Sequence, residues 1–227
     1  MPTEGIRRKK KILHKHTVIK KEEIGHNVFI IETNRIFDFL PGQIVAVALR
    51  ADGDQPRLYS IASGTNENCF RILFDINPKG VLTPSLAELN SGDELYISEP
   101  FGRFLGTEEP AFWIATGTGI APFISMCLSG LHENKTLLHG SRRLINFFYQ
   151  NLFKEKMGDR YLRFCTGEKS PEVIEGRLTN YLKDESNLSD SIKYYLCGSA
   201  EMIIEVRDIL IEQKGIPLEN IISEIYF

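Results

Sequence analysis

The sequence contains only four cysteines, Cys69, Cys127, Cys165 and Cys197, and no two of them form a CxxC pair. Zinc sites and iron-sulfur clusters use cysteines at short, regular spacing, so neither kind of metal site is expected. No apolar run approaches the roughly 18 residues of a membrane-spanning helix, and the start, MPTEGIRRKKK, lacks the apolar segment of a secretory signal. We therefore expect a cytoplasmic protein with reduced cysteines, no metal and no membrane contact.

The sequence also lacks internal repeats and low-complexity segments, and its net charge is only −3. The charge is uneven, however, because residues 1–21 carry eight Lys or Arg against the single acid Glu4. This segment predicts a solvated tail and an edge strand, and the alternative is a surface that attracts an acidic partner over long range. No aromatic pattern or recognition motif accompanies the basic residues, so we do not expect nucleic-acid binding.

Apolar residues make up 42% of the 227 positions, which is enough for a substantial core. Between about Lys11 and Phe104 they fall in short β-rich runs separated by turn signals. The runs are NVFIIET, QIVAVAL, RLYSIAS, CFRILFD and DELYIS. In CFRILFD, Phe70, Ile72 and Phe74 alternate with more polar or outward positions. Several such runs predict an antiparallel barrel or sandwich.

From Pro110 onward, β-rich runs alternate with helical segments. The runs are AFWIAT, KTLLHGS, YLRFCT, KYYLCGS and NIISEI, and the segments between them include APFISMCLSGL, LINFFYQNLFKEK, GRLTNYLKD and AEMIIEVRDILIEQKG. This alternation predicts a parallel sheet covered on both faces. The change of pattern near Gly106 to Glu109 divides the chain into residues 1–106 and 107–227.

Two motifs of the first half carry chemistry. In RLYS, Arg57 and Tyr59 share one face of an extended segment, where a cation can pair with a pyrophosphate and an aromatic ring can cover a flavin, and Ser60 can hydrogen-bond the ring. In KGVLT, Gly80 precedes the one helix expected in this half, with Thr83 as the N-cap, and a helix N-terminus attracts anions. Taken alone, the two motifs are also compatible with a plain strand and an ordinary helix cap.

Three motifs of the second half follow strands of the predicted sheet. Thr116–Gly119 lies at the first strand-to-helix turn, where open α/β sheets bind dinucleotide phosphates. Arg142 and Arg143 end the second strand and could clamp a ribose 2′-phosphate, with Tyr149 on the helix that follows. Gly198 in LCGSAEM lets a ligand approach the backbone.

In this order, RLYS, KGVLT, ATGTGIAP, HGSRR, LCGSAEM and the C-terminal SEIYF resemble the ferredoxin-NADP reductase family over nearly the whole chain, and the compact length resembles its bacterial ferredoxin (flavodoxin)-NADP reductases. The resemblance implies two domains. Residues 1–106 would form an antiparallel β-barrel that binds FAD. Residues 107–227 would form an α/β parallel-sheet, Rossmann-like domain that binds NADP(H).

The resemblance also implies an activity, in which hydride passes from NADPH to flavin N5 and electrons leave singly to ferredoxin or flavodoxin. It assigns orientation of the reacting groups to Ser60, Cys197 and Glu224, with no nucleophile. The FAD-binding residues that it implies are Arg57, Leu58, Tyr59, Ser60, Gly80, Val81, Leu82, Thr83, Tyr226 and Phe227. The implied nicotinamide-nucleotide residues are Thr116, Gly117, Thr118, Gly119, Ser141, Arg142, Arg143, Tyr149, Arg177, Cys197 and Gly198.

The sequence departs from the family pattern at residues 165–168, CTGE, where NADP-specific bacterial members have a further Arg. Arg142 remains, Arg143 or Lys169 could substitute, and Glu168 would repel a phosphate. We therefore favour NADPH and keep NADH open. The alternative functions are reduction of free flavin, a haem protein or an oxygenase component, and a non-catalytic nucleotide-binding module. We expect a monomer.

Overall fold

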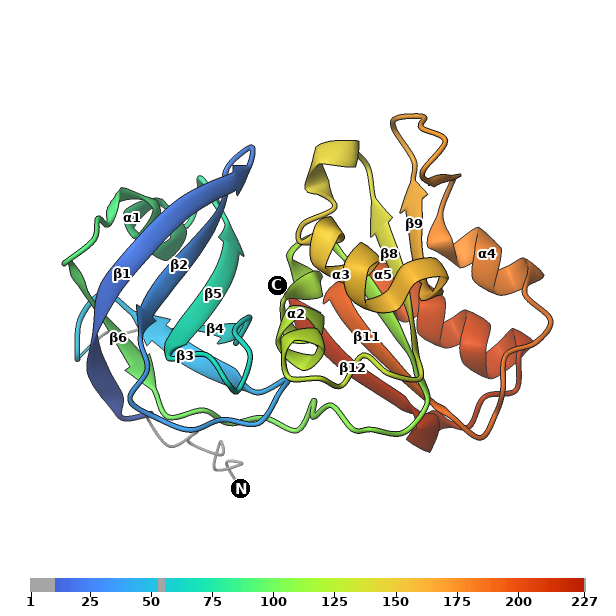
Figure 1. Ribbon diagram of the computed structural model, residues 1–227, viewed down its shortest axis with the longest axis horizontal. Coiled ribbons are helices and arrows are strands. Elements are labelled where there is room, and N and C mark those ends of the chain that lie inside the picture. Colours follow the sequence, from blue (N-terminus) through green and yellow to red (C-terminus); the bar gives the residue numbers. More distant parts are fainter. Residues whose placement is uncertain (1–10, 53–55, 227) are drawn as a thin grey trace, which may run out of the picture.

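A computed structural model describes residues 11–52 and 56–226, and residues 1–10, 53–55 and 227 lie outside this description. The described chain forms two halves side by side, an antiparallel sheet followed by a parallel sheet with helices (Figure 1). No described helix is long and apolar enough to cross a membrane.

Six strands of the described residues form the antiparallel sheet, in the order β4-β3-β6-β1-β2-β5. They are β1 (Leu13–Gly25), β2 (Val28–Asn34), β3 (Ile44–Ala48), β4 (Arg57–Ser60), β5 (Cys69–Asp75) and β6 (Glu94–Ser98). The two edge strands meet just beyond β4, where Ile61 bridges Ile72 and the Ala62 N–H donates to the Arg71 carbonyl at 2.8 Å. The sheet therefore closes on itself, which confirms the predicted barrel.

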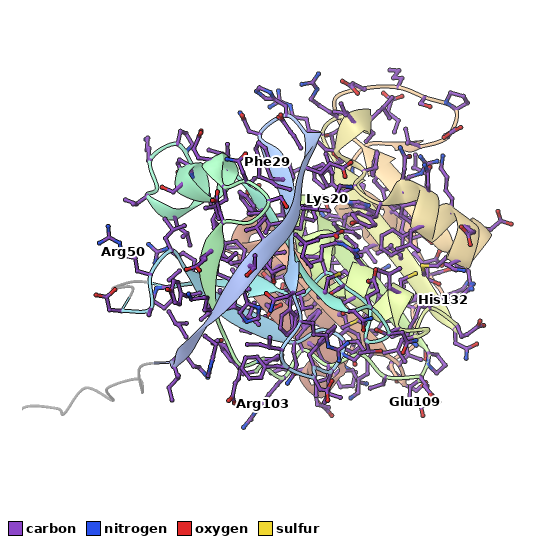
Figure 2. The ribbon with its side chains drawn as sticks, turned by 60° about the vertical axis from the view of Figure 1, so that its left-hand side comes forward. Lys20, Phe29, Arg50, Arg103, Glu109 and His132 are labelled. Carbon is purple, nitrogen blue, oxygen red and sulfur yellow. The ribbon has the colours of Figure 1, made fainter. Side chains whose placement is uncertain are left out.

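Strand β1 differs from its prediction as an edge strand. Its first part, Leu13–Thr17, pairs with β6 and its second part, Val18–Gly25, pairs with β2, so it lies inside the sheet. His16 and Val18 point into the barrel, whereas Lys15 and Lys20 are exposed on its outer side. Lys21 is half-buried and donates from its ammonium to the Ala87 carbonyl. In Figure 2, where the barrel faces the reader, β1 crosses the front and carries Lys20. The basic residues before Lys11 lie outside the described part of the chain.

Helix α1 (Leu82–Glu88) is the one α-helix of the barrel half within the described residues. It begins one residue before Thr83, with Val81 at the N-cap, so the prediction that Thr83 caps the helix is wrong. The Thr83 hydroxyl accepts the Asn77 N–H at 2.8 Å instead, and this bond holds the preceding loop. Leu86 packs into the barrel core, which comprises Val18, Ile31, Phe39, Val45, Val47, Ile61, Phe70, Ile72, Phe74, Leu86, Leu95 and Ile97.

Six further strands in the described residues form the parallel sheet, as predicted, in the order β10-β9-β8-β7-β11-β12. They are β7 (Ala111–Thr116), β8 (Lys135–Ser141), β9 (Tyr161–Cys165), β10 (Ile174–Glu175), β11 (Lys193–Ser199) and β12 (Ile221–Tyr226). The chain moves outward from β7 through β10 and then returns to the other side of β7. The carboxyl ends of β7 and β11 therefore diverge at a topological switch point, where sheets of this kind bind ligands.

Four α-helices of the described chain cover the two faces of this sheet. They are α2 (Ala121–Leu128), α3 (Gln150–Met157), α4 (Leu178–Asp184) and α5 (Ala200–Asp208). Alternate residues of β7 divide between the faces, since Trp113 and Ala115 pack with α2 and α3, and Ile114 packs with α4 and α5. This period of two is what a strand buried on both faces requires.

Helix α3 begins later than predicted. Residues 144–146 form a short 3₁₀ turn, and Tyr149 has a φ of 57°, in the left-handed region, directly before the first residue of the helix, Gln150. An α-helix cannot continue through a left-handed residue. Tyr149 therefore precedes the helix, whereas the sequence predicted that it lies on it.

The two halves share one apolar core. Val28, Ile30 and Leu73 on the outside of the barrel belong to the same buried cluster as Trp113 and the α2 residues. Leu73 lies at a position predicted to face outward, and it is buried because the second half covers it. The last strand, β12, leads the C-terminus back to the junction between the halves (Figure 1).

Candidate active site at the junction of barrel and sheet

A side-chain hydrogen bond joins β4 of the barrel to β12 of the parallel sheet. Ser60, the last residue of β4, donates from its hydroxyl to Glu224 Oε2 at 2.8 Å, although the two residues are 164 positions apart. Ser60 is 1% exposed, so this contact is shielded from bulk water. The fold thus brings together two of the three residues to which the sequence assigned orientation of the reacting groups.

The third residue, Cys197, lies beside Glu224. The two are register partners on the neighbouring strands β11 and β12, and Cys197 is also paired with Ala115 on β7. Cys197 is buried in the cluster that faces the barrel. Gly119 lies against the end of the same strand, because a Cβ placed on it would come within 2.4 Å of the Cys197 carbonyl oxygen. Glycine is therefore required for this close approach.

Glu224 has the electrostatics of a partly sheltered carboxyl group. Burial raises its pKa above the ordinary value of 4.5, and the hydrogen bond from Ser60 opposes that rise. The bond favours the charged carboxylate, which is an acceptor only. The protonation state of the Glu224 carboxyl group therefore depends on both halves of the molecule, because the hydroxyl that bonds to it comes from the barrel.

On the barrel side of the junction, strand β4 pairs only with β3, because the closure to β5 comes just beyond it at Ile61. Strand β4 is the edge of its sheet, and Arg57 and Leu58 on it are exposed, with Leu58 at 55%. Tyr59 is more sheltered, its ring lies edge-on to Phe74, and burial raises the pKa of its hydroxyl to about 12. An exposed cation, an exposed aliphatic side chain and a neutral tyrosine thus follow one another along this edge.

The turn before α1 contains the second motif of the first half, KGVLT. Gly80 donates its N–H to the Asn77 carbonyl at 2.9 Å, and Val81 at the N-cap is 84% exposed. No side chain caps the helix in this part of the described chain. Tyr59 and Leu82 both pack against the barrel core.

A hollow of about 300 Å³ opens at the carboxyl ends of the parallel strands. Its lining comprises Thr116, Gly117, Gly140, Ser141, Arg142, Asn146, Phe164, Thr166, Gly176, Arg177, Leu178, Thr179, Ser199, Glu201, Met202 and Glu205. Five of the residues predicted for nucleotide binding are among them, namely Thr116, Gly117, Ser141, Arg142 and Arg177. The hollow therefore lies at the switch point that the strand order defines.

The two arginines that line this hollow differ in their ion pairs. Among the described residues, no ion pair involves the guanidinium of Arg142, whereas Arg177 pairs with Glu205 at 3.1 Å and with Glu201 at 3.5 Å. The sequence interpretation did not assign Glu201 or Glu205 to the site. Their position in the first two turns after the LCGS strand end is the signal that would have found them.

Arg143 is not part of the lining. Its Nε donates to Glu168 Oε1 at 3.3 Å, and the other carboxylate oxygen of Glu168 accepts the Leu144 N–H at 2.7 Å. The hydrogen bond from the Leu144 N–H, followed by the Arg143 guanidinium, lowers the pKa of Glu168. Glu168 is thus a charged partner of Arg143 and does not line the hollow, where it was expected to repel a phosphate.

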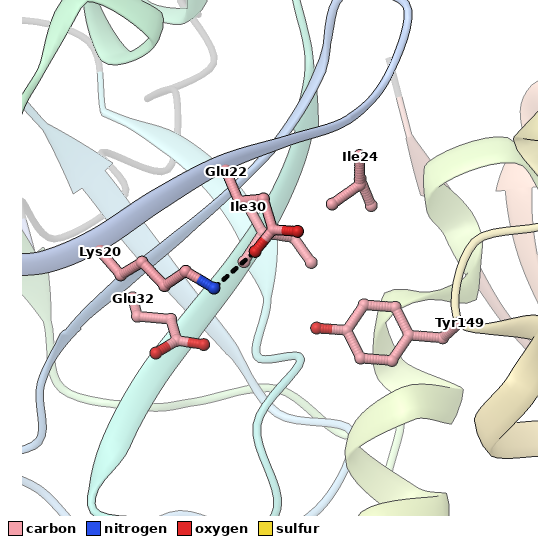
Figure 3. A pocket seen from close by; sticks show the side chains of 6 residues that line it. All are labelled: Lys20, Glu22, Ile24, Ile30, Glu32 and Tyr149. Atoms are coloured by element: carbon pink, nitrogen blue, oxygen red, sulfur yellow. Dashed lines mark hydrogen bonds and ion pairs between the residues drawn. The ribbon is translucent and has the colours of Figure 1, made fainter.

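Tyr149 lies in a different place from the other predicted nucleotide residues. Its side chain lines a separate hollow of about 250 Å³, and Figure 3 shows its hydroxyl pointing toward β1 and β2 of the barrel. The remaining lining residues are Lys20, Glu22, Ile24, Ile30 and Glu32. Burial raises the pKa of Tyr149 to about 12. The structure therefore uses Tyr149 as a contact between the two halves.

The remaining predicted residues are placed as follows. Thr118 and Gly119 lie in the 3₁₀ turn Gly117–Ile120 after β7, and Gly198, the last residue but one of β11, has a φ of +149°. Tyr226 is the last residue of β12, and Phe227 lies outside the described residues.

The comparisons with known proteins agree with this two-part architecture. A family model described as the Oxidoreductase FAD-binding domain matches residues 15–105, which include the barrel strands. A second, described as the Oxidoreductase NAD-binding domain, matches residues 113–208 and includes most of the parallel sheet. Together the two matches account for most of the chain and identify FAD and a nicotinamide nucleotide as its cofactors.

Individual proteins give the same picture. The ferredoxin-NADP reductase of Azotobacter vinelandii is 26% identical, with 87% of this chain and 89% of that protein covered. A flavohemoprotein of Rhizobium meliloti is 30% identical over 72% of this chain, which spans only 47% of that protein. In structure, the chain is similar to a ferredoxin NADP+ reductase from Neisseria gonorrhoeae, solved with bound FAD and NADP, with a TM-score of 0.85, 17% identity, and 96% and 100% coverage of the two chains.

The barrel coincides with the FAD-binding match, and the parallel sheet with its hollow coincides with the NAD-binding match. The chain therefore belongs to the ferredoxin-NADP reductase family of FAD- and NAD(P)-dependent oxidoreductases.

Proposed function

We propose that this oxidoreductase transfers electrons between NADPH and a one-electron carrier, ferredoxin or flavodoxin, through FAD held between residues 1–106 and residues 107–227. The observation that carries the proposal is the Ser60–Glu224 hydrogen bond of 2.8 Å. It joins β4 of the barrel to β12, the strand beside β11 at the switch point of the parallel sheet. A flavin bound by the barrel and a nicotinamide bound by the sheet would have to meet between these two strands.

The residues on the barrel side fit FAD. Leu58, next to the exposed Arg57 in sequence, and Val81 both expose apolar side chains, which suits a ligand with a flat ring and a charged pyrophosphate. In this proposal Arg57 would hold the pyrophosphate together with the main chain of Gly80, Val81, Leu82 and Thr83. Tyr59 would contact the flavin, a role that the proposal also gives to Tyr226 and Phe227.

The residues on the other side fit a nicotinamide nucleotide. Gly117 has a φ of +57°, and a Cβ placed on it would have no atom within 4 Å, so the turn after β7 leaves room beside its backbone. Thr116, Gly117, Thr118, Gly119 and Gly198 would border the phosphates and the nicotinamide. Ser141 and Arg142 would bind the 2′-phosphate, since the Arg142 guanidinium has no ion pair among the described residues.

When bound, FAD supplies hydride acceptance at N5 and one-electron release. The protein's own residues position the reacting groups. Ser60 and Cys197 are both buried at the junction and exclude water from it, and the hydroxyl of Ser60 fixes the orientation of the Glu224 carboxyl group. Glu224 holds or releases a proton at its carboxyl oxygen, and no side chain is needed as a nucleophile.

A haem protein is the second candidate acceptor, because a flavohemoprotein is among the relatives and this chain spans 47% of it. Steady-state reduction of ferredoxin, flavodoxin, cytochrome c and free FMN, at low and high ionic strength, separates the candidates. An acidic carrier is expected to have the highest kcat/KM, with a steep fall in salt. A higher kcat/KM for cytochrome c or free FMN would contradict the carrier assignment.

The first test of the whole proposal is the visible spectrum of the purified protein. The protein is expected to be yellow and to be bleached anaerobically at lower concentrations of NADPH than of NADH. If NADH bleaches it equally well or better, the assignment of NADPH is wrong. A protein that takes up no FAD, even after reconstitution, would contradict the proposed function itself.

A further inference from the structure

An acidic pair shares the nucleotide hollow with its two arginines. Glu201 and Glu205 lie four residues apart on α5, and both line the hollow. Arg177 bridges them, with Nη1 at 3.1 Å from Glu205 Oε2 and Nη2 at 3.5 Å from Glu201 Oε1. Lys183 also approaches Glu205, with its Nζ at 3.6 Å from Oε1.

Local structure explains why these acids are here. Ser199 caps α5, because its hydroxyl accepts the Met202 N–H at 3.3 Å, and Glu201 lies in the first turn, where the helix dipole favours an acid. Two acids at i and i+4 repel each other on a helix unless a cation lies between them. Arg177, at the N-cap of α4, provides that cation from the neighbouring helix.

The two arginines of the hollow are therefore not equivalent. Arg142 comes from the end of β8 and has no carboxylate partner in the described part of the chain, whereas Arg177 is engaged by two. The formal charges of Arg142, Arg177, Glu201 and Glu205 cancel. A 2′-phosphate entering the hollow would gain the attraction of Arg142 but would have to compete with two carboxylates for Arg177.

We propose that Glu201 and Glu205 are specificity-determining residues that restrain the preference for a 2′-phosphate by occupying Arg177, so that the protein accepts NADPH and NADH with modest discrimination. This inference rests on the proposed function, in which the hollow binds the adenosine end of the nucleotide. It adds that Arg142 alone favours the phosphate, and that the acidic pair opposes it.

The test measures binding of two probes, adenosine 2′,5′-bisphosphate and 5′-ADP, by calorimetry to the full-length protein. The selectivity ratio is the Kd of 5′-ADP divided by the Kd of the bisphosphate. Replacing Glu201 and Glu205 with Gln is expected to raise this ratio about tenfold, because it removes two partly solvated negative charges that compete with the 2′-phosphate for Arg177 at short range. The Kd of 5′-ADP is expected to stay within about twofold of the wild type, a result that general damage to the hollow would not give.

Controls make the outcome decisive. Glu212→Gln removes one exposed carboxylate from the turn that continues α5 and is expected to leave the ratio unchanged. Should the double variant fail to fold, Glu201→Gln alone serves, because its side chain is 79% exposed, and it is expected to raise the ratio in the same direction. A ratio unchanged in every Gln variant would overturn the inference. Failure of the wild type to bind either probe would overturn the proposed use of the hollow, and this inference with it.

Discussion

Gly198 at the end of β11 lies so close to Thr116 at the end of β7 that a Cβ on Gly198 would be 2.4 Å from Thr116 Oγ1. Its φ of +149° is also in the range that L side chains rarely adopt. The two strand ends that form the switch point can approach each other only because one of these positions is glycine. This relationship helps to fix the turn after β7, whose first residue, Gly117, lines the nucleotide hollow.

Gly198→Ala is therefore expected to separate the two strand ends. The free energy of unfolding should fall by roughly 1–3 kcal/mol, and binding of adenosine 2′,5′-bisphosphate should weaken. Urea unfolding and calorimetry measure the two effects. Gly215→Ala is the control, because Gly215 has a φ of +68° and no atom within 4 Å of the added Cβ, so it carries backbone strain without the clash. Equal losses in the two variants would contradict the role of close approach.

Ser60→Ala is expected to slow reduction of the flavin by NADPH. Loss of the hydrogen bond to Glu224 should cost about 1.5–3 kcal/mol, which corresponds to a rate roughly ten- to a hundredfold lower. Anaerobic stopped-flow absorbance measures the rate. Ser63→Ala removes another buried hydroxyl, one that accepts the Arg71 N–H at 3.2 Å, and should leave the rate nearly unchanged. A wild-type rate for Ser60→Ala would show that the bond does not orient the reaction.

Glu224 should make the stability of the protein without cofactor depend on pH. Its pKa is raised in the folded state by burial, so above the ordinary value of 4.5 the folded state holds this proton more tightly than the unfolded state does. Stability from this group is then present below that value and is lost as the pH rises through the folded-state pKa. Glu224→Gln should gain stability relative to wild type at pH 7 compared with pH 4. The difference is measured by urea unfolding, and an equal difference at both pH values would contradict the raised pKa.

Substitutions of Arg142 and Tyr149 should have different effects on the KM for NADPH, although both residues were predicted to bind the nucleotide. Arg142 lines the hollow, whereas Tyr149 contacts the barrel. Arg142→Ala should raise the KM for NADPH about tenfold, as loss of a charge-assisted hydrogen bond to phosphate would, and leave the KM for NADH nearly unchanged. Tyr149→Phe should change neither value. A raised KM for NADPH in Tyr149→Phe would show that the nucleotide reaches beyond the hollow.

The sequence was sufficient to predict both halves of the fold, because their patterns are local. Alternation of Phe70, Ile72 and Phe74 identifies a strand with one face in a core, and strand-helix alternation after Pro110 identifies a parallel sheet. The pattern was insufficient at Leu73, since its burial depends on the other half of the molecule. It was also insufficient at Tyr149, because its left-handed conformation and its contact with the barrel have no counterpart in the helical periodicity of residues 144–156.

The sequence by itself determined which residue types are present in which order, and hence the barrel, the parallel sheet and the motifs at the strand ends. Those properties depend on neighbours along the chain, through side-chain periodicity and turn chemistry. Only the tertiary structure decided that Ser60 meets Glu224, that Arg143 pairs with Glu168, and that Arg177 is held by two acids while Arg142 is not. Each of these contacts joins residues far apart in sequence, so no local pattern records it. The packing of strands, helices and loops in three dimensions sets which of these groups meet.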